Sequence, residues 1–117
     1  MKRPVNDLER HIIVRVAERL PEPKRSQLLQ DLAHAEAESF PSEQADRVVF
    51  HISGYERPPY RGQESFVWGG GEMKDKDGET VDWDVYEDQN GRLLELELIR
   101  YAPGKLIAAD WRTLMFF

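Results

Sequence analysis

The sequence predicts an α+β domain in which an N-terminal helical hairpin packs on one face of a four- to five-stranded antiparallel sheet. Apolar residues recur at helical spacing near the N-terminus and alternate with polar residues farther along. The dipeptides Asp77-Gly78 and Asn90-Gly91 mark tight turns. A chain of 117 residues can bury one core, so we expect a single domain, with the helical hairpin over residues 6–38 and the sheet over residues 46–117.

The two helices are predicted from caps and apolar spacing. Asn6 can cap the first helix, and Glu9, three residues on, completes a capping box. The apolar stripe of this helix consists of Leu8, Ile12, Ile13, Val16 and Leu20. Pro21 ends it, and Pro23 suits the first turn of the second helix. The second helix is expected to face the sheet with Leu28, Leu29, Leu32 and Ala33.

The strands are predicted from alternation at period two. Residues 47–52 place Val48, Phe50 and Ile52 on one side. A further strand opens at residues 66–68 and meets Gly69-Gly70-Gly71, where a bulge and a loop are both open interpretations. The Asp77-Gly78 turn then places residues 72–74 opposite residues 80–82.

The Asn90-Gly91 turn is the strongest local signal in the chain. With these two residues as the turn, the hairpin pairs Val85 with Leu96, Trp83 with Leu98, Tyr86 with Glu95 and Asp84 with Glu97. One face then collects Val81, Trp83, Val85, Leu94, Leu96 and Leu98, and the other collects Asp82, Asp84, Tyr86, Glu95 and Glu97. The apolar face is expected to form the core, which leaves the acidic face for solvent or a partner.

Charge and composition narrow the possible functions. The net charge is −6, and residues 72–97 hold ten acidic and three basic residues, whereas residues 1–25 are basic. An acidic surface repels nucleic-acid phosphates and speeds encounter with a basic protein. The absence of cysteine excludes disulfides and thiolate chemistry. Since there is no N-terminal apolar segment and no apolar run of membrane-spanning length, a cytoplasmic location is expected.

The polar residues indicate no reaction. The segment Asp75-Lys76-Asp77-Gly78-Glu79 matches only part of a calcium-binding loop. The histidines His11, His34 and His51 stand on different predicted elements, and paired carboxylates on an open sheet lack the enclosed cleft that acid–base catalysis requires. We therefore predict no catalytic residue, no metal and no cofactor.

The acidic face is the leading candidate for function. Asp82, Asp84, Glu95 and Glu97 are expected to pair with Lys and Arg of a partner protein, with Tyr86 as an aromatic anchor. The loop tyrosines Tyr55 and Tyr60 are expected to join the same interface. The competing interpretation is an ordinary solvated face whose charges are neutralised by Lys and Arg of neighbouring strands or loops.

Residues 75–117 resemble small bacterial immunity proteins of polymorphic toxin and contact-dependent growth inhibition systems. The resemblance rests on Asp77-Gly78, residues 88–97, Leu106-Ile107 and residues 110–114. It implies a non-catalytic inhibitor that binds one cognate toxin domain, often a basic nuclease, and blocks its active site or substrate surface. We expect such an inhibitor to be a monomer or a weak homodimer.

Two alternatives from other classes stay open. A small enzyme or a metal- or ligand-binding domain would have a cleft between the helices and the sheet, with an acid or a histidine of perturbed pKa inside it. A homo-oligomeric structural or adaptor protein would bury Phe116 and Phe117 at an interface between copies.

Overall fold

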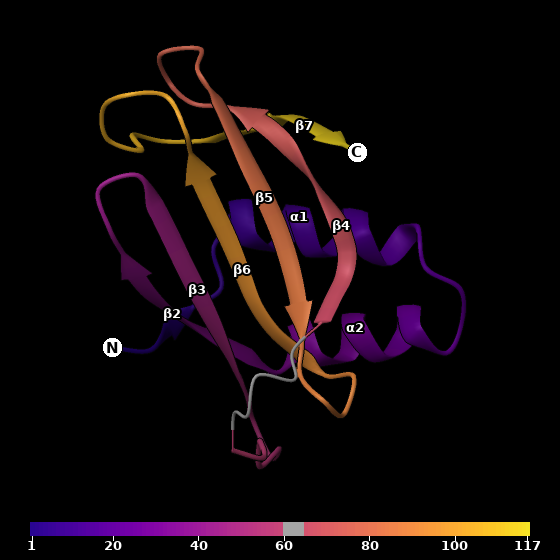
Figure 1. The fold of residues 1–117 in the computed structure, drawn as a ribbon. Helices are drawn as coiled ribbons and strands as arrows, with labels where there is room; N and C mark the ends of the chain where they lie inside the picture. Colours follow the sequence, from indigo (N-terminus) through magenta and orange to yellow (C-terminus); the bar gives the residue numbers. More distant parts are fainter. Residues whose placement is uncertain (60–64) are drawn as a thin grey trace.

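The computed structural model describes residues 1–59 and 65–117. Two helices, α1 (Asp7–Glu18) and α2 (Lys24–Ala33), lie on one face of an antiparallel sheet (Figure 1). The strands are β1 (Arg3–Pro4), β2 (Ala35–Pro41), β3 (Ala45–Ile52), β4 (Ser65–Lys74), β5 (Thr80–Glu87), β6 (Leu93–Arg100) and β7 (Asp110–Phe116). The α+β class and the antiparallel sheet are confirmed. Within the described ranges, every helix is too short or too polar to span a membrane.

The sheet is larger than the sequence predicted. Seven strands of the described residues follow the order β1-β2-β3-β6-β5-β4-β7, so the prediction of four to five strands is wrong. The helical part ends at Ala33 and does not reach the predicted residue 38, because β2 begins at Ala35, and the short strand β1 precedes α1. Alanine and glutamate favour helices, but Ala37 is buried between the exposed Glu36 and the half-buried Glu38, and this alternation suits pairing with β3.

The helix caps and most of the core were predicted correctly. Asn6 and Glu9 form the capping box, with the Glu9 amide donating to the Asn6 side chain over 2.8 Å. From α2, Leu28 and Leu32 enter the core, whereas Leu29 and Ala33 are exposed, contrary to prediction. The largest fully buried side chains are Trp83 and Phe50, which lie between the helices and the sheet with their neighbours on β3, β5 and β6.

The β5–β6 hairpin has the predicted register over most of its length. Asp84 lies opposite Glu97, and Val85 lies opposite Leu96. The turn is a three-residue loop over residues 89–91, because the Asp88 amide donates a hydrogen bond to the Arg92 carbonyl over 2.9 Å. Gly91 supplies the positive φ, 73°, that such a loop requires. An irregularity in register after Tyr86 compensates for the odd loop length, so that Leu93 is buried in the core in place of the predicted Leu94.

The glycine run lies inside β4 and is not a loop. One register shift precedes it and another spans it, so the bulge interpretation is confirmed. A Cβ atom on Gly71 would lie 1.9 Å from the Met115 carbonyl oxygen and 2.7 Å from the Trp83 ring. Gly71 therefore lets β7 and the buried tryptophan approach the same point of β4.

Substituting Gly71→Ala is expected to destabilise the protein by about 3 kcal/mol or more, because the added methyl group overlaps backbone and a buried ring that have little room to move. Gly69→Ala is the matched control, since nothing lies within 4 Å of the position that its Cβ atom would take and the strand conformation accepts alanine. Urea unfolding of both variants measures the difference. Equal stability of the two would show that β7 does not pack on Gly71 as described.

Candidate protein-binding face

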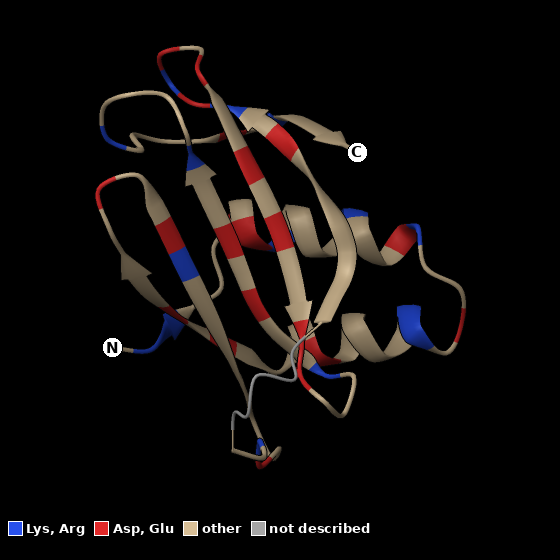
Figure 2. Cartoon of the chain, viewed as in Figure 1, with Lys and Arg blue, Asp and Glu red and all other residues tan. Residues whose placement is uncertain are grey.

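The face of the sheet opposite the helices carries a continuous group of acidic side chains. Asp82 and Asp84 of β5 point to this side because Val81, Trp83 and Val85 alternate with them and are fully buried. Glu97 lies opposite Asp84 on β6, and Glu72 lies opposite Asp82 on β4. Figure 2 shows acidic positions gathered along these central strands. We call Glu72, Asp82, Asp84 and Glu97 the acidic stripe.

The stripe has little compensating positive charge. In the described ranges, Glu72, Asp82 and Asp84 make no ion pair or hydrogen bond through their carboxylates. The cations at its borders are engaged elsewhere: Arg47 binds Glu95 over 3.1 Å, and the Lys74 ammonium group donates to the Thr80 hydroxyl over 3.1 Å. The structure therefore places Asp82 and Asp84 on one face of the sheet, as the sequence predicted. The contact of Arg47 with Glu95 neutralises acidic charge only at the edge of this face.

Glu95 differs from the other predicted acids. It is only 8% exposed and it holds Arg47, so its carboxylate supports the sheet and is not presented to a partner. Glu72, which the sequence analysis did not select, replaces it in the stripe. The signal was available, because the predicted Asp77-Gly78 turn already placed residues 72–74 opposite residues 80–82.

Crowding of like charges alters the acidity of the face. Burial, together with the negative charges of Glu97 and Asp82, raises the pKa of Asp84. Burial and the charge of Glu72 raise the pKa of Asp82. The pKa of Tyr86 rises to about 12, since its half-buried phenol is surrounded by Glu97, Asp84 and Glu95. A cation bound against the stripe would offset the repulsion between these negative charges.

An aromatic pair lies at one end of the stripe. The Tyr86 ring stacks on Phe66 of β4 with ring centroids 4.9 Å apart, and Phe66 is 55% exposed. The Tyr86 hydroxyl donates to Glu97 over 3.4 Å, which joins the pair to the acids. Tyr86 thus lies on the acidic face, as predicted. Phe66 is an additional exposed aromatic residue on this face. The sequence did not reveal it, because the bulge in β4 interrupts the alternation of side chains that would assign Phe66 to a face.

The predicted loop tyrosine Tyr55 is engaged within the protein. Its hydroxyl donates to Asp88 over 2.6 Å, and the Arg92 guanidinium lies 4.2 Å from the centre of its ring. Tyr55 is therefore part of the hydrogen-bonded network that closes the β5–β6 turn, and its predicted role in partner binding is not supported. The other predicted loop tyrosine, Tyr60, lies outside the described residues.

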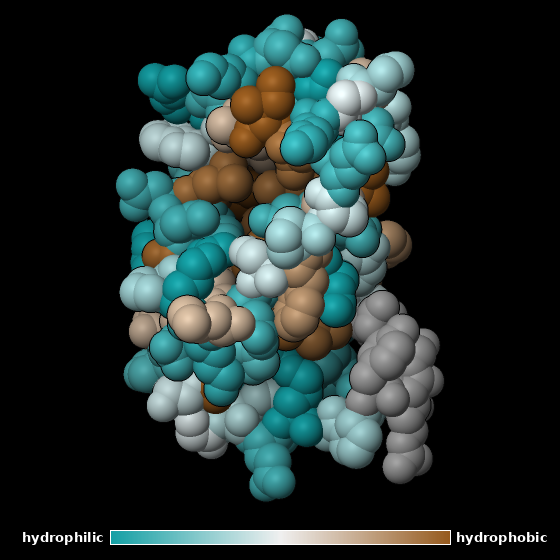
Figure 3. Space-filling model, turned by 90° about the vertical axis from the view of Figure 1, so that its left-hand side faces the viewer, coloured by the Kyte–Doolittle hydropathy of each residue, from teal (hydrophilic) through white to brown (hydrophobic). Residues whose placement is uncertain are grey.

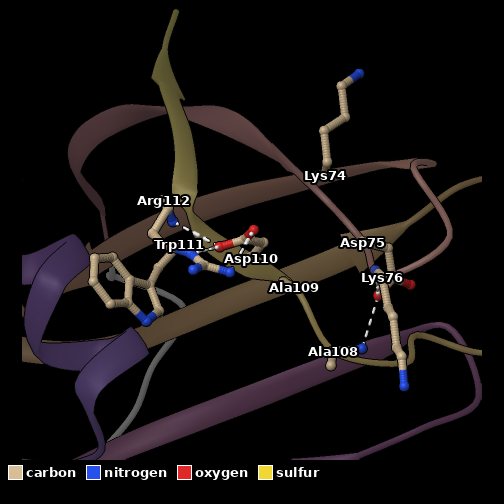
Figure 4. A pocket seen from close by; sticks show the side chains of 8 residues that line it. All are labelled: Lys74, Asp75, Lys76, Ala108, Ala109, Asp110, Trp111 and Arg112. Atoms are coloured by element: carbon tan, nitrogen blue, oxygen red, sulfur yellow. Dashed lines mark hydrogen bonds and ion pairs between the residues drawn. The ribbon is translucent and has the colours of Figure 1, made fainter.

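The described residues hold no cluster of three or more His, Cys, Asp or Glu side chains suited to a metal ion. A cavity of about 580 Å³ lies between the end of β4 and residues 108–112 (Figure 4). Its acids are already bound: Asp110 holds Arg112 over 2.9 Å, and Asp75 accepts the Ala108 amide over 2.7 Å. Lys74 and Lys76 point in different directions in Figure 4, so they do not converge on a ligand.

The edge strand β7 adds exposed apolar residues. Met115 lies opposite Glu72 and is 55% exposed. Phe116 is half-buried, with its ring 5.1 Å from Trp83 and covered by the guanidinium of Arg19, so it is not free for the interface between copies that one alternative required. Phe117 is 69% exposed.

Neutralising one acid of the stripe, Asp84→Asn, is expected to stabilise the protein at neutral pH by about 0.5–1 kcal/mol, because it removes a like-charge pair across adjacent strands. The folded-state pKa of Asp84 is raised, so its ionised form destabilises the fold above that pKa. The advantage of the variant should disappear as the pH falls through this pKa and the native carboxyl becomes protonated.

Asp110→Asn is the matched control, because the Arg112 side chain lowers the pKa of Asp110 and its ionised form is favoured in the fold. This substitution should leave stability unchanged or lower it at neutral pH. Thermal unfolding across a pH series measures both variants. A lower stability of Asp84→Asn at neutral pH would show that the stripe is compensated.

Comparison of the chain with protein-family models, with curated proteins and with solved structures finds no match. What the protein binds is therefore inferred from the chemistry of the acidic stripe and its aromatic border.

Proposed function

We propose that this protein is a non-catalytic inhibitor of the immunity type, which binds a cognate basic toxin domain through the acidic stripe. The observation that carries the proposal is the row of Glu72, Asp82 and Asp84, half-buried acids on adjacent strands without ion-pair partners in the described part of the chain. Such a row repels itself, and a surface that carries Lys and Arg relieves the repulsion.

The aromatic border adds a means of holding the partner after encounter. Aromatic residues next to a polar rim are common binding hot spots, because they bury a large area with little loss of side-chain freedom. Phe66 and Tyr86 present such an area directly beside Glu97. Charge would govern the rate of association, and burial of Phe66 would slow dissociation.

The inhibition follows from the kind of surface that the stripe would cover. A nuclease binds the phosphates of its substrate with Lys and Arg. Carboxylates on a rigid sheet can occupy the same cations and exclude the nucleic acid. The inhibitor itself needs no cofactor for this action, and we propose that it acts in the cytoplasm, as a monomer or a weak homodimer.

Reversing two charges, Asp84→Lys with Glu97→Lys, is expected to weaken the complex with the basic partner at least about a hundredfold, because like charges then face each other across the interface. Affinity capture from native lysate at low and high salt identifies the partner. Titration calorimetry with the purified partner then measures the change in affinity.

A matched control makes the same change in net charge away from the stripe. Glu18→Lys with Glu43→Lys alters exposed positions on α1 and on the β2–β3 turn. This variant should retain the partner, with affinity within a few-fold of the original. A partner that binds the stripe variant and the control equally well, or the recovery of no basic protein, would contradict the proposal.

A further inference from the structure

A second surface feature is a groove at one end of the core, away from the acidic stripe. Its cavity has a volume of about 230 Å³, and its walls include Leu8 of α1, Pro41 of β2, Leu98 of β6, and Leu106 and Ile107 of the segment before β7. Figure 3 shows apolar side chains gathered around a hollow on this side of the molecule. The groove lies where α1 meets the sheet, so it is also the place where a ligand-binding cleft was expected.

The outer wall of the groove is held by hydrogen bonds. The Leu106 amide donates to the Glu43 carbonyl over 3.0 Å, and the Ile107 amide donates to the Asp75 carboxylate over 3.0 Å. Asp75 is itself fixed by Arg100, over 2.8 Å. The segment before β7 is thus anchored on both sides, and the groove does not need a ligand to form it.

One carboxylate lines this apolar groove. Asp46 precedes Val48, Phe50 and Ile52 in the core-facing row of β3, and it lies opposite Leu98. Its Oδ1 atom is buried and has no hydrogen-bond partner in the described residues. Burial and the neighbouring charge of Glu9 raise the pKa of Asp46, which agrees with an unsatisfied position.

The charge of Arg3 compensates Asp46 only in part. The Arg3 guanidinium binds both oxygens of Glu9, over 2.9 and 2.6 Å, and also the Ser39 hydroxyl over 2.7 Å. Arg3 therefore makes its direct contacts with Glu9 and Ser39, and its charge offsets only part of the effect of burial and of Glu9 on Asp46. In the described ranges, every buried Asp or Glu binds an arginine, and the half-buried Asp46 does not.

We propose that this groove binds a primary ammonium group on a short aliphatic chain, with the Asp46 carboxylate as its anchor. Because Oδ1 is closed off from the groove, the ammonium group would reach the Asp46 carboxylate through Oδ2. It would supply a hydrogen-bond donor and a positive charge, and the aliphatic chain matches the leucine and isoleucine walls. The volume suits a ligand of about half a dozen non-hydrogen atoms. A free alkylamine and a lysine side chain both carry this chemistry.

The test is a titration of the protein with three ligands of equal chain length, hexylammonium, hexanol and hexanoate, followed by the amide resonances of the groove in NMR spectra. Hexylammonium should shift the resonances of Leu98, Ile107 and Ala108 saturably. Hexanol should bind at least about tenfold more weakly, and hexanoate should not bind. Equal binding of hexylammonium and hexanol would overturn the proposal, whatever the behaviour of any variant.

Asp46→Asn tests the anchor with little change of shape. Its affinity for hexylammonium should fall at least about tenfold, while its affinity for hexanol stays the same. Asp110→Asn, a neutralised acid outside the groove, should bind as the original protein does. Unchanged hexylammonium binding by Asp46→Asn would overturn the role of the carboxylate.

Two further arms separate the possible sources and sites. Nα-acetyl-lysine methylamide replaces hexylammonium: if it binds more tightly, the source is a lysine side chain, and if hexylammonium binds more tightly, the source is a free amine. The Asp84→Lys, Glu97→Lys variant should keep the shifts of Ile107 and Ala108, because Glu97 and the groove residue Leu98 point to opposite sides of β6. Loss of the shifts in that variant would assign the binding to the stripe and overturn this inference.

Discussion

Burial of the row Val81, Trp83 and Val85 is the constraint on which the acidic face depends. Each of these side chains is fully buried, and Trp83 contacts Gly71 of β4 and Phe116 of β7. Because side chains alternate along a strand, Asp82 and Asp84 cannot turn inward without exposing the tryptophan. The hydrophobic core thus fixes the direction of the acids, although the acids themselves oppose close pairing of the strands.

The buried carboxylates of the described residues differ from the acidic stripe in their partners. The buried ones each hold an arginine: Glu9 binds Arg3, Asp31 binds Arg92, Asp75 binds Arg100, Asp88 binds Arg57 and Glu95 binds Arg47. These pairs connect β1 to α1, α2 to the β5–β6 turn, and the β4–β5 turn to β6. Since so many arginines are bound inside the structure, the acids of the stripe keep their negative charge.

The stripe and the groove offer unbalanced negative charge in two different settings. The stripe is open to solvent, where its field reaches a partner before contact and is weakened by salt. Asp46 lies beside apolar side chains. There a hydrogen bond from a donor group to its carboxylate stabilises a complex more than it would in water, and a ligand that leaves its polar group unpaired is disfavoured. The first setting suits the surface of a protein, and the second suits one small chemical group. The two sites share β6, but Glu97 faces the stripe and Leu98 faces the groove on the other side of the sheet, so one can fail without the other.

The sequence by itself determined the features that depend on neighbouring residues. The capping box at Asn6, the core-facing row of β3 and the pairing of Asp84 with Glu97 follow from local spacing and turn chemistry, and the structure confirms them. Tertiary structure decided the rest. β2 was hidden by the helical preference of alanine and glutamate until β3 supplied a partner strand. The irregular register after Tyr86 selected Leu93 for the core.

Placement of individual side chains depended on the sheet order, which no local pattern contains. Because β3 lies next to β6, Arg47 reaches Glu95 and removes it from the stripe. The loop after β3 returns to the β5–β6 turn, so Tyr55 binds Asp88 instead of facing a partner. Asp46 has the same alternation in sequence as the core-facing row of β3, but only the tertiary structure shows that Arg3 makes its ion pair with Glu9. Periodicity determines which way a side chain points, and long-range packing determines what it meets there.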